Sequence, residues 1–103
     1  LAAEALYGLG EKEEAIKAYI NILTDMDVYD YLDRNFALNS IDIIHETDNE
    51  IAGPELVNAV KQLVQYRIDN PISGTNAGYE MRTAPYLLQK WGVEIEIPGG
   101  QFR

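Results

Sequence analysis

The 103-residue sequence contains no cysteine, which excludes disulfide bonds, thiolate metal sites and cysteine nucleophiles. Basic residues are scarce, since eight Lys and Arg stand against seventeen Asp and Glu and the net charge is −9. This charge repels nucleic acid and anionic membrane surfaces, because binding phosphates requires several Lys or Arg. Apolar runs are only a few residues long, too short to span a bilayer. We therefore expect neither nucleic acid nor a membrane as a partner.

What the sequence does contain is enough apolar material, 47% of its residues, for one small domain with one core. Residues 1–6 have a helical pattern from the first position, without a capping residue before them. No initiator Met and no signal-peptide pattern is present. We therefore interpret position 1 as a truncation point, upstream of which any signal peptide would lie.

Two segments, residues 1–9 and 36–44, repeat the same pattern of small and large apolar residues at an offset of 35. Each places them at i, i+3, i+4 and i+7, which is one face of a helix. Small residues on that face suit a closely approaching neighbour helix. The matched pairs are Ala2 with Ala37, Ala5 with Ser40, Leu6 with Ile41 and Leu9 with Ile44.

A second amphipathic helix is predicted after each of these segments. The apolar residues of the two helices have the same spacing along the sequence, and corresponding positions are 40 residues apart. The five extra residues fall in the second inter-helix loop, residues 45–53, where an insertion has a small entropic cost. The two stripes are Ile16, Tyr19, Ile20 and Leu23 in the first and Leu56, Ala59, Val60 and Leu63 in the second.

Turn and capping residues agree with these four helices. Gly10 separates the first two helices, and Asp33 is predicted to cap the third. Gly53 and Pro54 begin the fourth, with Pro at the first helical position, and Asn70 precedes the proline that stops it.

The C-terminal third is predicted to begin with a loop at residues 70–78, followed by a helix at 79–91 that ends at Gly92. Pro85 lies either in the first turn of this helix, with Thr83 as cap, or inside a longer, kinked helix. Residues 93–97 alternate like a short strand, which must pack on the helix, pair with another segment or be disordered.

Together these features predict an all-α fold, a right-handed α-α superhelix of HEAT type. It has two helix hairpins and a capping helix in a domain at residues 1–92, and an extended tail at residues 93–103. About three such pairs are usually needed for stability, so the N-terminal edge is expected to expose apolar surface. A parent domain or a second copy would cover that edge.

No catalytic, cofactor-binding or metal-binding residue is predicted. Calcium requires several oxygen ligands from one loop, but Tyr29 and Phe36 stand where the calcium-loop pattern needs ligands, and a solvated loop is preferred. His45 is interpreted as a structural or surface histidine, because no nucleophile or orienting acid is placed beside it. The candidate calcium ligands were Asp25, Asp27, Asp30 and Asp33.

Two further groups have a binding and a structural interpretation. Six aromatic residues could form a sugar-stacking platform, although such residues are more often at the edge of a core. Four basic residues could bind a sulfate or phosphate group, although salt bridging is preferred in so acidic a chain. The groups are Tyr29, Tyr31, Tyr66, Tyr79, Tyr86 and Trp91, and Arg34, Arg67, Arg82 and Lys90.

Residues 2–15, Ala-Ala-Glu-Ala-Leu-Tyr-Gly-Leu-Gly followed by Glu-Lys-Glu-Glu-Ala, resemble the HEAT-like C-terminal repeats of bacterial sulfatases, especially those of gut Bacteroidetes. Residues 79–92 resemble the closing segment of such chains, so the resemblance covers about residues 1–92. It implies a periplasmic or exported parent hydrolase with a separate α/β catalytic domain, which holds calcium and a formylglycine made within a Cys/Ser-x-Pro/Ala-x-Arg motif.

No catalytic residue is carried over from that family, because neither Ser40 nor Ser73 lies in the motif. The resemblance implies a non-catalytic accessory domain that packs on the catalytic domain or associates with itself through its N-terminal helices. Calcium is expected only in the catalytic domain. A protein-interaction solenoid and a glycan-binding module remain alternatives.

Overall fold

A computed structural model describes residues 2–70 and 75–95, except for the side chains of residues 75–80. Over these ranges the chain is all-helical and contains no strand, which confirms the all-α prediction. None of the described helices is long and apolar enough to cross a membrane. The helices are α1 (Ala2–Gly8), α2 (Lys12–Thr24), α3 (Tyr31–Thr47), the 3-10 helix η1 (Asn49–Ile51), α4 (Pro54–Asp69) and α5 (Thr75–Lys90).

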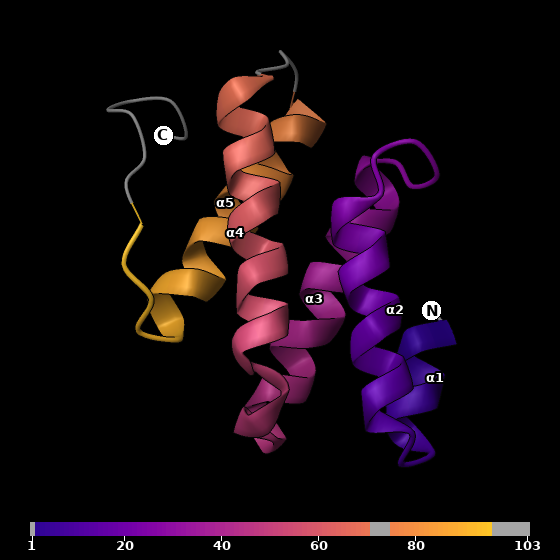
Figure 1. The fold of residues 1–103 in the computed structure, drawn as a ribbon. Helices are drawn as coiled ribbons and strands as arrows, with labels where there is room; N and C mark the ends of the chain where they lie inside the picture. The colour runs from indigo at the N-terminus through magenta and orange to yellow at the C-terminus, as the bar shows by residue number, and fades with distance from the viewer. Residues whose placement is uncertain (1, 71–74, 96–103) are drawn as a thin grey trace.

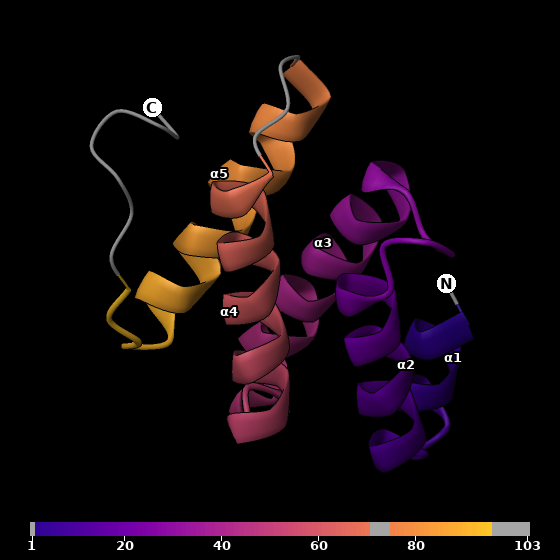
Figure 2. The same cartoon turned by 45° about the horizontal axis from the view of Figure 1, so that its top comes forward.

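The helices lie in two layers, with α2 and α4 side by side in front and α3 and α5 behind them (Figure 1). Accordingly, α2 packs on α4 and α3 packs on α5, so these two helices each contact the α-helix two positions further along. The remaining packed pairs, α1 with α2, α2 with α3 and α4 with α5, join the layers. Figure 2 shows α1 on the outer side of α2, at the opposite end of the array from α5.

The core between the layers is aliphatic. The predicted stripe of α4 is fully buried, and Tyr19 and Leu23 of α2 are buried opposite it. Ile16 and Ile20, from the predicted α2 stripe, are partly buried and pack at the core edge. A polar contact joins α2 to α3 inside this core, where the hydroxyl oxygens of Tyr19 and Ser40 lie 2.5 Å apart.

Two glycines end helices in the same way. Gly10 and Gly92 have φ of +88° and +77°, which side chains rarely adopt, so glycine is required there. After α1, the amide of Gly10 donates to the carbonyl of Tyr7 and that of Glu11 to Leu6. Gly92 and Val93 form the equivalent pair of bonds after α5. Both ends are therefore Schellman caps.

The beginning of α3 corrects one prediction. Asp30, not Asp33, is the N-cap residue, and its side chain accepts from the amide of Asp33 at 3.0 Å. Asp33 lies at the third helical position and accepts from the amide of Asp30 at 3.1 Å. The two carboxylates form a reciprocal capping box, so α3 begins at Tyr31, earlier than a cap at Asp33 would allow.

The beginning and end of α4 confirm the predictions. Gly53 is the N-cap, Pro54 is the first helical residue and Asn70 follows the last, Asp69. Pro suits the first helical position because a backbone N–H there would have no partner within the helix, so its absence in proline loses no hydrogen bond.

The inward face of α1 differs from the predicted one. Ala3 is buried and Tyr7 packs against the core, whereas Ala2, Ala5 and Leu9 are exposed. A seven-residue helix makes too few core contacts to be oriented by alanines alone. The hydroxyl of Tyr7 finds a partner inside the array, and this places the Ala3–Tyr7 side inward.

The C-terminal helix α5 begins earlier than predicted, since residues 75–78 are helical rather than loop. Residues 71–74 lie outside the described part of the chain. Pro85 lies inside the helix, as the second alternative had it. Helix propensity is a weak guide here, and packing against α3 and α4 outweighs the glycine and asparagine near its start.

The predicted strand is not formed at residues 93–95. Val93 and Ile95 are partly buried against the core, which is the packed alternative for this segment. Residues 96–103 of the predicted tail lie outside the described residues.

Candidate functional site

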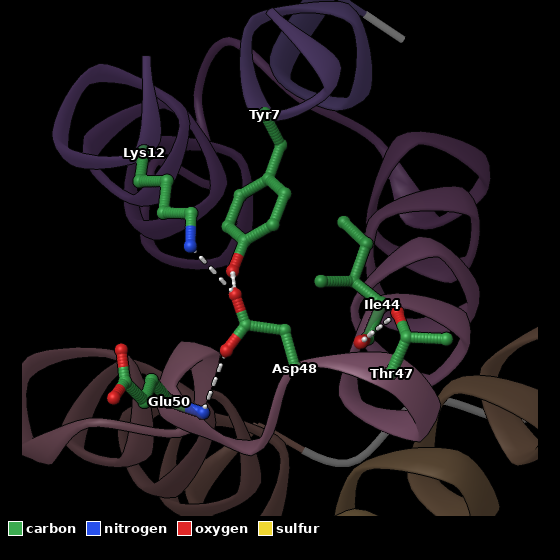
Figure 3. A network of polar contacts seen from close by, with 6 residues as sticks. All are labelled: Tyr7, Lys12, Ile44, Thr47, Asp48 and Glu50. Atoms are coloured by element: carbon green, nitrogen blue, oxygen red, sulfur yellow. Dashed lines mark hydrogen bonds and ion pairs between the residues drawn. The ribbon is translucent and has the colours of Figure 1, made fainter. Parts of the chain in front are cut away.

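The most connected polar cluster lies where the α1–α2 hairpin meets the corner between α3 and η1 (Figure 3). One Asp48 oxygen, Oδ2, accepts hydrogen bonds from the Tyr7 hydroxyl and from Lys12 Nζ, the latter at 2.9 Å. The other oxygen, Oδ1, accepts from the amide of Glu50 at 3.1 Å and so caps η1. The Lys12 ammonium also lies 5.6 Å from the centre of the Tyr7 ring.

Local sequence explains why these three side chains converge. The Schellman cap at Gly10 reverses the chain, which places Tyr7 and Lys12 on either side of one tight turn. Asp48 ends α3 and begins η1, so its side chain projects from a corner. Tyr7 is 41 residues away from Asp48 and Lys12 is 36 residues away, so only the tertiary fold brings them together.

The contacts fix the protonation state of each group. The hydrogen bonds from Tyr7 and then Lys12 lower the pKa of Asp48 from 3.8 to about 2. Burial raises the pKa of Tyr7 from 10.0 to about 12, and the hydrogen bond to the ionised Asp48 is the second-largest cause of this shift. The hydrogen bond to Asp48 also raises the pKa of Lys12.

At neutral pH the cluster therefore holds an ionised carboxylate, a neutral phenol and an ammonium ion. General acid–base catalysis favours groups whose pKa lies near the working pH, and the shifts of Asp48 and Tyr7 lead away from it. The arrangement suits a structural lock, which ties the first helix hairpin to the α3–η1 corner.

A second cluster joins the last turn of α5 to the second half of α3. Lys90 Nζ bonds Asp42 at 2.8 Å and Glu46 at 2.6 Å, and these hydrogen bonds raise the pKa of Lys90. The two acids are four residues apart, which places them on one side of α3. This confirms, for Lys90, the preference for salt bridging. Its ammonium also lies 6.0 Å from the Tyr86 ring.

The other basic residues of the predicted group lie apart from this cluster. Arg34 is buried in α3 and donates to the carbonyl oxygen of Tyr29 at 2.8 Å. Arg67, in the last turn of α4, lies 5.1 Å from the Tyr66 ring. Arg82 is exposed on α5. The four residues thus occupy three helices, α3, α4 and α5.

The predicted aromatic group is spread over several elements as well. Tyr29 and Trp91 pack against the core, whereas Tyr66 and Tyr86 are exposed on α4 and α5. Tyr31 is partly buried in the first turn of α3, and the side chain of Tyr79 lies outside the described residues. The ring contact of Trp91 is with His45, at 5.8 Å between centroids and 41° between planes.

The contact of His45 with Trp91 is thus a tilted one. The structural role of His45 stays a prediction. The indole Nε1 of Trp91 is buried and has no hydrogen-bond partner among the described residues.

The aspartates considered for calcium take part in turns and caps. Asp25 accepts from the amides of Asp27 and Val28, each at 3.2 Å, in the turn between α2 and α3. Asp30 and Asp33 form the capping box of α3. Within residues 2–70 and 75–95, apart from the side chains of residues 75–80, no group of three metal-ligating side chains occurs.

The Asp48 cluster is the site that sequence reasoning missed. Its one local signal was the turn chemistry of residues 47–50, where the pattern Thr47-x-x-Glu50 resembles a capping box. The structure uses Asp48 instead, which accepts from the Glu50 amide. Thr47 bonds back to the carbonyl of Ile44 at 3.2 Å.

Comparison of the chain with protein-family models, with curated proteins and with solved structures gives no match.

Proposed function

We propose that this chain is a non-catalytic helical-repeat segment of HEAT type that acts as an accessory domain of a larger, sulfatase-like hydrolase. The observation that carries the proposal is the packing of helices two positions apart, α2 on α4 and α3 on α5. Helix-hairpin solenoids stack in this manner, since each hairpin buries its apolar face only against its neighbours. The resemblance of residues 2–15 and 79–92 to sulfatase C-terminal repeats supports the parent's identity.

The exposed side of α1 supports a role that depends on a neighbouring unit. Ala2, Ala5 and Leu9 face solvent, and Leu9 is 80% exposed. Small residues at such spacing allow close approach of another helix. In this proposal the catalytic domain of the parent, or a second copy of the chain, packs on α1. The parent is periplasmic or exported, as the resemblance implies.

The chemistry of the described residues supports an accessory role. Tyr7, Lys12 and Asp48 hold charge states that suit a structural lock, and Lys90 joins α5 to α3. Substrate chemistry and its calcium therefore belong to the parent's own catalytic domain.

The coding sequence upstream of the Leu1 codon tests this proposal most directly. A reading frame that continues upstream into an α/β domain with a Cys/Ser-x-Pro/Ala-x-Arg motif would support it. A start codon close to Leu1, or an upstream domain of another kind, would refute it.

In the longer protein, Leu9→Asp is expected to weaken the contact between α1 and the adjoining domain without unfolding α2 to α5. Limited proteolysis would then cut between the two parts faster than in the wild type. The matched control is Val28→Asp, which alters another exposed apolar residue, in the turn between α2 and α3. Equal cleavage of both variants would argue against packing on α1.

A second candidate function, a protein-interaction module, is favoured by one further observation. The outward face of α3 carries large exposed apolar side chains.

A further inference from the structure

Helix α3 is apolar on two opposite faces. Its inward face buries Ala37, Leu38 and Ile41 in the core. Its outward face carries Leu32, Phe36 and Ile43, which are 49%, 60% and 68% exposed. An amphipathic surface helix normally has polar residues on the side away from the core, so this second apolar face requires an explanation.

The three outward residues, named here the α3 stripe, lie on one side of the helix, with the half-buried Asn39 between Phe36 and Ile43. At 100° per residue Leu32, Phe36 and Ile43 fall within about 40° of one another around the helix axis. They extend over about 16 Å at 1.5 Å per residue. Val28, 68% exposed in the turn before α3, adds an apolar residue near the N-terminal end of the helix. This length suits the apolar face of a short helix laid against it.

The surroundings of the α3 stripe are acidic. Residues 25–50 contain eight Asp and Glu, whereas Arg34 is their only Lys or Arg and is buried. Lys90 and Lys12 from other segments neutralise part of this charge. The carboxylates outside those ion pairs are Asp25, Asp27, Asp30, Asp33 and Glu50.

Acidic residues also flank the stripe on both sides. On the α5 side, Asp42 and Glu46 share the single charge of Lys90. On the other side, Asp33 lies about 80° around the helix axis from the centre of the stripe, near its N-terminal end, at 100° per residue. An apolar surface with acidic residues on both sides is complementary to a partner surface whose apolar residues lie between basic residues.

We propose that the α3 stripe is a docking surface for an amphipathic helix of another polypeptide segment, with apolar residues on one face and Lys or Arg along both flanks. A second copy of this chain would bring the same acidic flanks to the stripe, and their mutual repulsion disfavours the pairing of two stripes. An anionic membrane surface is repelled for the same reason. This proposal uses a different face from α1 and does not depend on the accessory-domain proposal, but it deepens the second candidate function, the protein-interaction module.

The test uses the full chain and three synthetic helical peptides carrying a fluorescent label. One has a leucine face with lysine flanks, the second has the same leucine face with glutamate flanks, and the third is a scrambled version of the first. Fluorescence anisotropy measures their affinity for the wild type and for the Phe36→Ser, Ile43→Ser and Leu9→Ser variants. Leu9 is the control, because it is also an exposed apolar residue, at 80%, and lies on α1. Circular dichroism shows whether each variant retains its helix content.

The leucine–lysine peptide is expected to bind the wild type and Leu9→Ser equally. Phe36→Ser and Ile43→Ser should each weaken binding by about tenfold, which corresponds to about 1.4 kcal/mol. Amide chemical-shift changes should follow the outward face of α3, from residue 28 to residue 46. The glutamate and scrambled peptides should bind at least about tenfold more weakly.

Several results would overturn the proposal. Equal loss in Leu9→Ser would indicate non-specific apolar contact. Equal binding of the scrambled peptide would indicate attraction by net charge alone. Absence of binding by the leucine–lysine peptide would also refute it. So would a wild-type dimer in sedimentation experiments that Phe36→Ser makes monomeric, because the stripe would then join two copies. Binding to zwitterionic vesicles that Phe36→Ser abolishes would assign the stripe to lipid instead.

Discussion

The hydrogen bond between Tyr19 and Ser40 offers a quantitative test of the packing between α2 and α3. Both residues are buried, at 0% and 5% exposure, and their hydroxyl oxygens lie 2.5 Å apart. Ser40→Ala leaves the Tyr19 hydroxyl buried without this partner, which costs about 1–3 kcal/mol. Tyr19→Phe should cost less, because the Ser40 hydroxyl can bond back to the carbonyl of Phe36, four residues earlier in the helix.

The double variant Tyr19→Phe/Ser40→Ala removes both hydroxyls and leaves no unsatisfied group, so its cost should be smaller than the sum of the single costs by about 1 kcal/mol or more. Urea denaturation followed by circular dichroism measures the free energies of unfolding. On heating, each kcal/mol corresponds to a shift of about 4–8 °C in Tm for a domain of this size. As a control, Thr47→Ala removes an exposed hydroxyl and should change stability by less than about 0.5 kcal/mol. Additive single costs would refute the buried bond.

Three further predictions concern local structure and pH. Gly10→Ala should destabilise the chain by about 1 kcal/mol because of its positive φ, whereas Gly53→Ala, at φ −73° with ordinary contacts around its Cβ, should be nearly neutral in the same urea experiment. Asp30→Ala should lower the free energy of unfolding by about 1 kcal/mol through loss of the α3 cap, whereas Asp30→Asn should retain most of the wild-type stability, since asparagine caps equally well. Equal losses of stability in the two variants would argue against the cap. Ionised Asp48 contributes stability that is present above pH 3.8 and is lost as the pH falls toward about 2, because its folded-state pKa is lowered. The difference in urea midpoint between wild type and Asp48→Asn should therefore shrink over that range, and a constant difference would contradict the assigned pKa.

Helix α4 shows what the sequence alone was able to predict. Pro54 fixed its start, Asn70 its end, and the spacing of its apolar residues identified its buried face. Sixteen residues give four turns of consistent pattern, so one face can be chosen with little ambiguity. Turn residues such as Gly10 and Gly92 were equally informative, since the left-handed conformation requires glycine.

Helix α1 shows where that reasoning fails. Seven residues make fewer than two full turns, and alanines on every side leave its inward face undetermined. Tyr7 decides the question through Asp48, which is 41 residues further along the chain. A contact of this kind depends on the position of the hairpin relative to α3, which no local pattern encodes. The Asp48 cluster was unpredictable for the same reason, and the cap at Asp30 was missed because Asp33 fits a capping role almost as well.

Two sets of lysine–carboxylate contacts join segments far apart in the sequence, Lys12 to Asp48 at the α1–α2 end of the array and Lys90 to Asp42 and Glu46 of α3 at the α5 end. Carbodiimide coupling joins a lysine directly to a carboxylate in contact with it, and mass spectrometry identifies the joined peptides. The Nζ–O distances of 2.9 Å for Lys12 with Asp48 and of 2.8 Å and 2.6 Å for Lys90 with Asp42 and Glu46 predict these as the main cross-links between segments far apart in the sequence. Cross-links from Lys90 to carboxylates of α1 or α2 in place of Asp42 and Glu46 would contradict the arrangement.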